Sequence, residues 1–138
     1  MRKRILAVLL TAILSVVCLG SMFGVSAQTP SEAVPYGIYC QTCRSELSLS
    51  GSTATCKSTV IGTSSVTKIY VNQNLQKKTS TGGWSNVTHW NTTVSGNSGT
   101  VTKTKTGLAN GTYRLLTVAT FYTSSATEQA SSVSAERP

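Results

Sequence analysis

Most of the chain consists of short stretches in which apolar and polar residues alternate, separated by glycine-containing turns. The stretch around Ile69, Val71 and Leu75 shows this pattern, because polar or aromatic residues occupy the positions between them. Side chains of a β-strand point alternately to the two faces of a sheet, and the chain has almost no stretch with the 3.6-residue period of a helix. Strands are therefore expected at about 44–50, 53–61, 66–77, 84–91, 100–106, 112–123 and 128–134.

This spacing of strands predicts an all-β fold. Seven short strands within about 95 residues are typical of a two-sheet antiparallel sandwich of the immunoglobulin-like or fibronectin III-like kind. Cys56 lies on the second strand, where immunoglobulin-type domains place a core cysteine, and Tyr113 follows a turn in the manner of a tyrosine corner. Leu115 occupies the position of the second core cysteine, which excludes the inter-sheet disulfide of antibody domains.

The N-terminal residues have the composition of an export signal. Residues 2–4 are basic, residues 5–19 are predominantly apolar, and small residues precede position 28. This order predicts a signal peptide that is cleaved after Ala27 and a protein that is secreted to the extracellular space. An uncleaved membrane anchor is the alternative, because the apolar run approaches the length of a bilayer span. The expected organisation is a signal peptide at 1–27, an irregular lead-in at 28–43 and a β-sandwich domain at 44–138.

Acidic residues are scarce. The chain has no Asp, its four Glu residues lie towards the ends of the part after the signal peptide, and His89 is its one histidine. Paired catalytic carboxylates, a Ser-His-Asp relay and an oxygen-rich calcium site all depend on such residues. The composition therefore predicts a protein that is not an enzyme and that holds no metal or cofactor.

The basic residues are spread along the chain. The part beyond residue 27 keeps nine of the twelve Lys and Arg residues and all four Glu, which gives a formal net charge of +5. Scattered lysines are typical of solvated strand edges that resist aggregation. No dense basic patch with interleaved aromatic residues indicates a nucleic acid ligand. We expect a monomer that binds no nucleic acid and has no stable membrane insertion after signal cleavage.

Three cysteines follow the signal peptide, two of them in the sequence Cys40-Gln41-Thr42-Cys43. A tight hairpin at Gly51-Ser52 pairs residue 47 with Cys56, which leaves Cys43 too far from Cys56 for an unstrained bridge. Outside the cell a disulfide is the default state of neighbouring cysteines. The expected arrangement is a Cys40–Cys43 disulfide with Cys56 as a buried free thiol, and a bridge to Cys56 is the alternative. A zinc site lacks a fourth ligand, and a redox C-x-x-C pair usually opens a helix.

Aromatic residues are the main candidates for a binding site. Trp84 and Trp90 are six residues apart, so a regular strand places both on one face and Val87 on the other. Either both faces of this strand are covered by other parts of the protein, or a β-bulge lies between the two tryptophans. Exposed aromatic residues on one sheet face can stack on sugar rings or form a protein-binding patch, whereas buried ones fill the core. The candidate binding residues are Trp84, His89, Trp90, Tyr70 and Tyr122.

Three segments follow one another along about residues 45–134: LSLSGSTATCKSTVIG, TKIYVNQNLQKKTSTGGWSNVTHW and GTYRLLTVATFY. They contain a G-x-W-x-x-V-x-x-W segment after a Leu-Gln strand end, and a late G-x-Y-R strand. The residues concerned are Gly83, Trp84, Val87, Trp90, Leu75, Gln76, Gly111, Tyr113 and Arg114. In these features the chain resembles a group of small secreted proteins of Gram-positive gut bacteria, whose function is unknown. The resemblance implies export and a β-sandwich and brings no activity with it.

Taken together, these features predict a secreted, non-catalytic binding or surface-interaction module. Its partner is expected to be an extracellular protein or a glycan. One alternative is a thiol-based redox or metal-dependent protein that uses Cys40 and Cys43. A second is a secreted antagonist that acts on membranes through its positive charge, although the chain has no amphipathic helix for this purpose.

Overall fold

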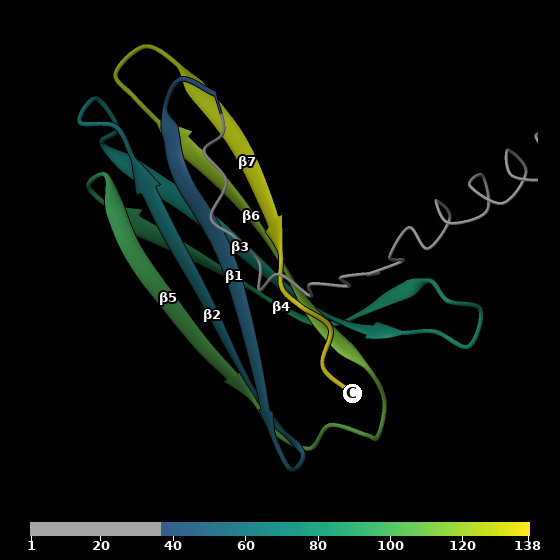
Figure 1. The fold of residues 1–138 in the computed structure, drawn as a ribbon. Coiled ribbons are helices and arrows are strands. Elements are labelled where there is room, and N and C mark those ends of the chain that lie inside the picture. Colours follow the sequence, from purple (N-terminus) through teal and green to yellow (C-terminus); the bar gives the residue numbers. More distant parts are fainter. Residues whose placement is uncertain (1–36) are drawn as a thin grey trace, which may run out of the picture.

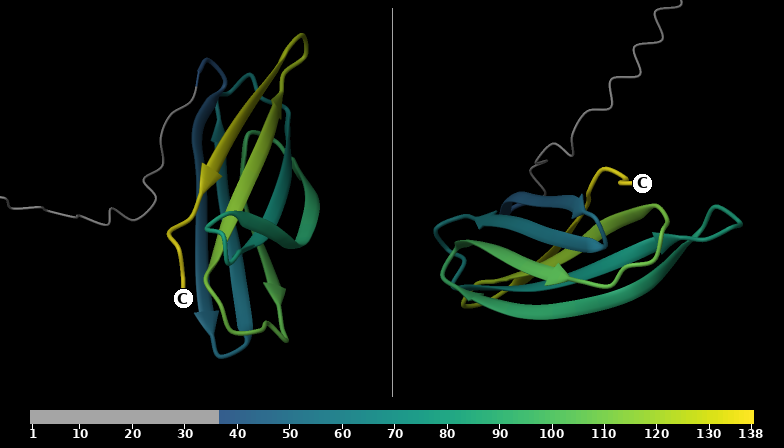
Figure 2. Two further views of the ribbon diagram at one scale, coloured as in Figure 1. Left: turned by 90° about the vertical axis from the view of Figure 1, so that its right-hand side faces the viewer. Right: turned by 90° about the horizontal axis from the view of Figure 1, so that it is seen from below.

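The computed structural model describes residues 37–138, which form seven antiparallel strands in two sheets (Figure 1). One sheet has the order β1-β2-β5 and the other has the order β4-β3-β6-β7. Figure 2 shows the two sheets as stacked layers. The strands are β1 (Cys40–Ser50), β2 (Thr53–Gly62), β3 (Lys68–Lys78), β4 (Trp84–Ser95), β5 (Ser98–Lys105), β6 (Tyr113–Tyr122) and β7 (Thr127–Val133).

This architecture confirms the predicted immunoglobulin-like or fibronectin III-like sandwich. The fourth strand pairs with the third and joins the four-stranded sheet, as strand C′ does in variable-type immunoglobulin domains. The β3–β4 hairpin extends beyond the body of the sandwich (Figure 1). Among residues 37–138 there is no helix long and apolar enough to cross a membrane.

The first hairpin has the register that the sequence predicts. Leu47 lies opposite Cys56 and Cys43 lies opposite Val60, on either side of a turn at Gly51, whose φ of +58° favours glycine. The expected boundary of the lead-in is wrong at its C-terminal end, because β1 begins at Cys40 and includes the C-x-x-C segment. The rest of the lead-in up to residue 36, and the signal peptide at 1–27, lie outside the described residues.

The loop expected at 92–100 is also different. β4 continues to Ser95 and β5 begins at Ser98, so a tight turn joins them. Gly96 takes a φ of +88° in this turn, and its amide donates to Thr67 O at 2.8 Å. Thr and Ser side chains in this region alternate between half-buried and exposed, which is compatible with an edge strand as well as with a loop.

The space between the sheets contains two apolar clusters with polar side chains between them. Phe121 and Ile69 belong to the first cluster, and Leu75 and Leu115 belong to the second. Four buried polar residues lie between the clusters, and we call them the polar belt: Ser45, Ser58, Gln73 and Thr117. Hydrogen bonds within the belt connect β1, β2, β3 and β6, so polar contacts as well as apolar packing hold the two sheets together.

Tyr113 forms the tyrosine corner that the sequence predicts. Its side chain is 3% exposed, and its Oη donates to the backbone oxygen of Ala109 at 2.5 Å. The Tyr113 backbone also pairs with Arg137 through two hydrogen bonds of 2.7 and 2.8 Å. The start of β6 therefore anchors both the preceding loop and the C-terminal segment.

Glu128 of β7 holds the beginning of β1 in place. Its carboxylate accepts hydrogen bonds from the backbone amides of Ile38, Tyr39 and Cys40 at 2.8–3.1 Å. Gly37 has a φ of +63°, and a Cβ there would lie 2.7 Å from the carboxylate, so only glycine fits. Burial raises the pKa of Glu128, but the three amide donors outweigh this effect and hold its pKa below the ordinary value of 4.5.

The Glu128 contact predicts a dependence of stability on pH. A lowered pKa in the folded state stabilises the protein above about pH 4.5, and this stabilisation is lost as the pH falls through the folded-state pKa. Glu128→Gln is expected to cost about 1 kcal/mol at pH 7 and much less at pH 3, as measured by urea unfolding. Glu136→Gln is the control, because Glu136 makes only an exposed ion pair with Lys78. Equal losses at both pH values would contradict the assignment.

Candidate functional site

A β-bulge places the two tryptophans on opposite faces of β4. Leu75 lies opposite Thr88 and Gln76 lies opposite Asn86, so Val87 is an extra residue without a partner on β3. The extra residue reverses which residues of β4 point inward and which point outward on the two sides of the bulge. Trp84 therefore points to the outer face of the four-stranded sheet, and Trp90 packs against the second apolar cluster. Of the two alternatives that the sequence left open, the structure contains the bulge.

The other aromatic candidates lie on the same outer face as Trp84. Tyr70 pairs with Thr93, His89 pairs with Asn74, and Tyr122 pairs with Lys68, all at outward positions of the register. Tyr70 is 37% exposed and His89 is exposed. The structure thus brings four of the five predicted binding residues to one sheet face and moves Trp90 to the interior.

Cationic side chains hold two of these rings. The Arg114 guanidinium lies 4.2 Å from the centre of the Trp84 ring, and Lys78 Nζ lies 5.6 Å from it. Lys68 Nζ lies 4.7 Å from the centre of the Tyr122 ring. Such cation–π contacts are worth about 0.5–1 kcal/mol at exposed sites, which is enough to favour one ring orientation.

A row of side-chain amides runs between the aromatic residues. Asn72 Nδ2 donates to Asn91 Oδ1 at 2.5 Å, and Asn74 Nδ2 donates to Asn72 Oδ1. Further along, Gln76 Nε2 donates to Asn86 Oδ1 at 2.8 Å, and Arg114 Nε donates to Gln76 Oε1 at 2.8 Å. These bonds orient the amides and leave each with further donor or acceptor capacity towards solvent.

We call this surface the aromatic–amide face. It comprises Tyr70, Asn72, Asn74, Gln76, Trp84, Asn86, His89, Asn91, Arg114 and Tyr122. The amide positions could have been found from the sequence, because Asn72, Asn74 and Gln76 alternate with residues predicted to point inward. Because β3, β4 and β6 contain no Asp or Glu, the face carries hydrogen-bonding groups and positive charge but no strand carboxylate. Chemically, it can bind hydroxyl-rich or anionic groups.

A second β-bulge determines where the C-x-x-C thiols point. The β1–β2 register shifts between Cys40 and Thr42, so Gln41 is the extra residue. Without the bulge, residues three apart would face opposite sides of the strand. With it, both Cys40 and Cys43 point inward, and they are 2% and 1% exposed.

The expected Cys40–Cys43 disulfide is not formed, and residues 37–138 contain no disulfide. In an extended strand, residues three apart are separated by roughly 10 Å, more than the Cα separation that a bridge tolerates. Cys56 is buried as expected. Burial and the neighbouring Cys40 raise the pKa of Cys43 to about 12, and burial raises the pKa of Cys56 to about 11.

Neither a metal site nor a catalytic constellation is apparent in the part of the chain that the structure describes. Within residues 37–138, no group of three or more His, Cys, Asp or Glu side chains is placed to hold a metal ion. His89 lies on the aromatic–amide face opposite Asn74, and Glu46, Glu128 and Glu136 all bind cations or backbone amides of the protein itself.

The structure contains a further feature that the sequence does not indicate, a basic pocket on the other sheet. It is lined by residues of β1 and β2 and by the C-terminal segment, and it includes Arg44, Lys57 and Arg137. The alternation of Arg44 and Glu46 along β1 is visible in the sequence, but the arrival of Arg137 depends on the path of the chain after β7.

Compared with known proteins, the chain matches no family model, and neither a curated protein nor a solved structure shows significant similarity to it. The resemblance to secreted proteins of Gram-positive gut bacteria therefore stays a prediction.

Proposed function

We propose that this chain is a secreted, non-catalytic binding module that recognises a glycan with its aromatic–amide face. One observation carries the proposal: the bulge at Val87 brings Trp84 into line with His89, Tyr70 and a row of hydrogen-bonded amides on an outward sheet face. The export signal predicted from residues 1–27 supports secretion, so a ligand would be met outside the cell.

The chemistry of the face favours a glycan over a protein partner. A sugar presents hydroxyl groups that both donate and accept, and side-chain amides offer both functions from one planar group. The rings of Tyr70 and Trp84 supply apolar surface against which the C–H groups of a sugar ring can pack. Interfaces between proteins, in contrast, have an apolar core, whereas the centre of this face is occupied by Asn72, Asn74 and Asn91.

Binding to a panel of immobilised polysaccharides tests the proposal. Trp84→Ala is expected to weaken binding of the recognised glycan at least about tenfold, because a contact made by a large aromatic side chain contributes more than about 1.4 kcal/mol. The unfolding midpoint should change little, since Trp84 lies on the outside of the projecting hairpin. Ile38→Ala is the matched control, because Ile38 is 77% exposed and precedes β1, which belongs to the other sheet.

Trp90→Ala should show the opposite behaviour. Trp90 packs against the second apolar cluster, so its truncation is expected to cost about 2 kcal/mol of unfolding free energy. Glycan binding by the folded fraction should persist. A Trp84→Ala variant that binds every tested glycan as well as the wild type would refute the proposed site.

A further inference from the structure

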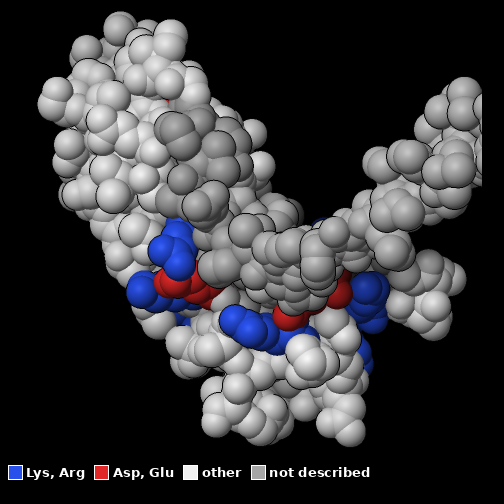
Figure 3. Space-filling view, in the orientation of Figure 1, with Lys and Arg blue, Asp and Glu red and all other residues white. Residues whose placement is uncertain are grey.

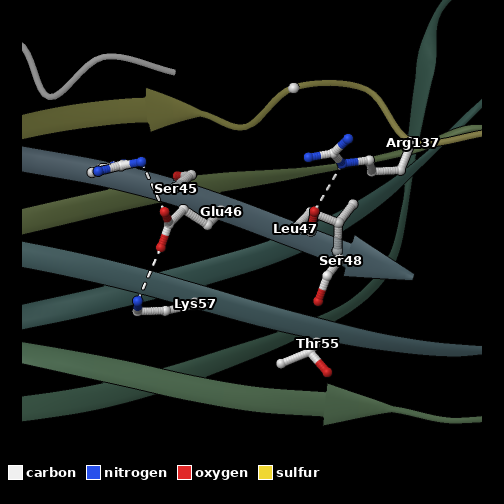
Figure 4. A pocket seen from close by; sticks show the side chains of 9 residues that line it. Ser45, Glu46, Leu47, Ser48, Thr55, Lys57 and Arg137 are labelled. Atoms are coloured by element: carbon white, nitrogen blue, oxygen red, sulfur yellow. Dashed lines mark hydrogen bonds and ion pairs between the residues drawn. The ribbon is translucent and has the colours of Figure 1, made fainter. Parts of the chain in front are cut away.

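The basic pocket lies on the outer face of the three-stranded sheet, where the C-terminal segment runs beside β1 (Figure 4). Its volume is about 330 Å³. Figure 3 shows basic and acidic side chains gathered across the middle of this side of the molecule. The lining residues that the argument uses are Arg44, Glu46, Ser48, Thr55, Lys57 and Arg137.

The pocket has more positive than negative charge. Both carboxylate oxygens of Glu46 are engaged, one by Arg44 Nη2 at 2.8 Å and the other by Lys57 Nζ at 3.2 Å. Among the described residues no carboxylate pairs with Arg137. Three cations therefore surround a single carboxylate, and the pocket retains two positive charges that the protein does not neutralise.

The backbone fixes the position of Arg137. Two hydrogen bonds with Tyr113 hold its main chain, and its Nε donates to Leu47 O at 3.0 Å. The remaining guanidinium N–H groups are directed over the pocket (Figure 4). An arginine held in this way presents a planar fork that matches the oxygens of a carboxylate or sulfate group.

Arg44 provides the second guanidinium group of the pocket, and its side chain is 40% exposed. Its Nε is buried and has no hydrogen-bond partner among the described residues, which is costly for a polar group. Arg44 lies three residues from Leu47, so roughly 10 Å of β1 separates its backbone from the carbonyl that anchors Arg137. Ser48 and Thr55 also line the pocket and add hydroxyl groups there.

We propose that this pocket binds an acidic polysaccharide, with Arg44 and Arg137 contacting carboxylate or sulfate groups on successive sugar units. The supporting observations are the excess of positive charge among the lining residues, the fixed guanidinium of Arg137 and the exposed side chain of Arg44. The pocket and the aromatic–amide face belong to different sheets, so the two proposals stand independently.

Titration of the full secreted chain with polygalacturonate and with dextran sulfate tests the pocket, with neutral dextran as the reference polymer. We expect saturable binding of at least one acidic polymer at 150 mM salt. Arg44→Gln combined with Arg137→Gln should weaken it at least about tenfold, since charge-assisted bonds are lost at two positions. Lys103→Gln combined with Lys105→Gln removes the same charge from edge strand β5 and should change binding less than about twofold.

Several outcomes would contradict the proposal that the pocket binds an acidic polysaccharide. If both double variants lost the same affinity for the polymer, net charge alone would account for its binding. Binding of free sulfate or acetate without polymer binding would mean an adventitious ion only. Arg137→Lys keeps the positive charge and removes the planar guanidinium group. If this folded variant bound the polymer as tightly as the wild type, the proposed contact of the Arg137 guanidinium would be contradicted. Trp84→Ala should leave acidic-polymer binding intact, and its loss in that variant would assign the polymer to the aromatic–amide face instead.

Discussion

Thr117→Val is expected to lower the free energy of unfolding by about 2 kcal/mol and the Tm by roughly 10 °C. Thr117 is fully buried on β6, and its Oγ1 makes hydrogen bonds of 2.6 Å with Ser45 Oγ of β1 and Ser58 Oγ of β2. Valine has nearly the same shape, so the substitution removes two hydrogen bonds and creates almost no cavity.

The effect is large because the polar belt spans both sheets. Ser58 Oγ also accepts a hydrogen bond of 2.8 Å from Gln73 Nε2, and Ser45 Oγ lies 2.9 Å from the backbone oxygen of Ser132. Each serine therefore keeps one partner when Thr117 is replaced, but it loses a strong bond in a region of low dielectric constant. Leaving buried hydroxyls with fewer partners costs more than the net value of the bonds themselves.

Chemical denaturation of the variant and of Thr120→Val provides the measurement. Thr120 points outward from the same strand, so the same chemical change there should alter stability by less than about 0.5 kcal/mol. A double-mutant cycle of Ser58→Ala with Thr117→Val should show a coupling energy of about 1 kcal/mol. If Thr117→Val and Thr120→Val were equally stable, the belt would contribute nothing to cohesion between the sheets.

Much of the fold could be predicted from alternation and turn chemistry. The first hairpin follows from Gly51 and from the parity of Leu47 and Cys56, because one register alone buries both apolar faces. The tyrosine corner follows from the position of Tyr113 after a turn at the start of the penultimate strand. These features depend on local patterns that a single sequence displays directly.

The parts that could not be predicted depend on single extra residues and on contacts distant in the sequence. A bulge at Val87 or Gln41 reverses the faces of all residues beyond it, and neither position differs in kind from an ordinary strand residue. The start of β1 depends on Glu128, 88 residues further along the chain from Cys40. The aromatic candidates could therefore be listed from the sequence, but the separation of Trp84 from Trp90 could not.

The basic pocket shows the same limitation. Arg44 and Lys57 are brought together by the first hairpin, whose register is predictable. Arg137 reaches them because residues after β7 return to pair with Tyr113, which no local pattern indicates. Gln73 is a further case, since alternation predicts an inward position but not the hydrogen bonds that its buried Nε2 donates to Ser58 Oγ and Val101 O.

The cysteine thiols of the native protein are expected to react with iodoacetamide at least about a thousandfold more slowly than those of the unfolded chain. At pH 8, a thiol with a pKa of about 12 is thiolate in about one molecule in ten thousand. At the ordinary value of 9.0, the thiolate fraction is about one in ten. Burial of Cys40, Cys43 and Cys56 also blocks access of the reagent.

The raised thiol pKa values also make the protein less stable in alkaline solution. A folded state that holds these protons more tightly than the unfolded chain is stabilised below about pH 9. This stabilisation is lost as the pH rises through about 11 for Cys56 and 12 for Cys43. Urea midpoints should therefore fall between pH 8 and pH 10.5 by more in the wild type than in a Cys43→Val/Cys56→Val variant, which lacks these two thiols.

These two measurements decide between the binding module and a thiol-based protein. A redox or metal-binding C-x-x-C pair needs a thiolate that solvent can reach, and its pKa is lowered by its surroundings. Here the bulge at Gln41 directs both thiols into the first apolar cluster, where the pKa of Cys43 moves the opposite way. Rapid labelling of Cys40 or Cys43 in the native protein would support a thiol-based function. Slow native labelling, followed by incorporation of three equivalents when the protein is unfolded without reductant, would show that all three thiols are buried in the core.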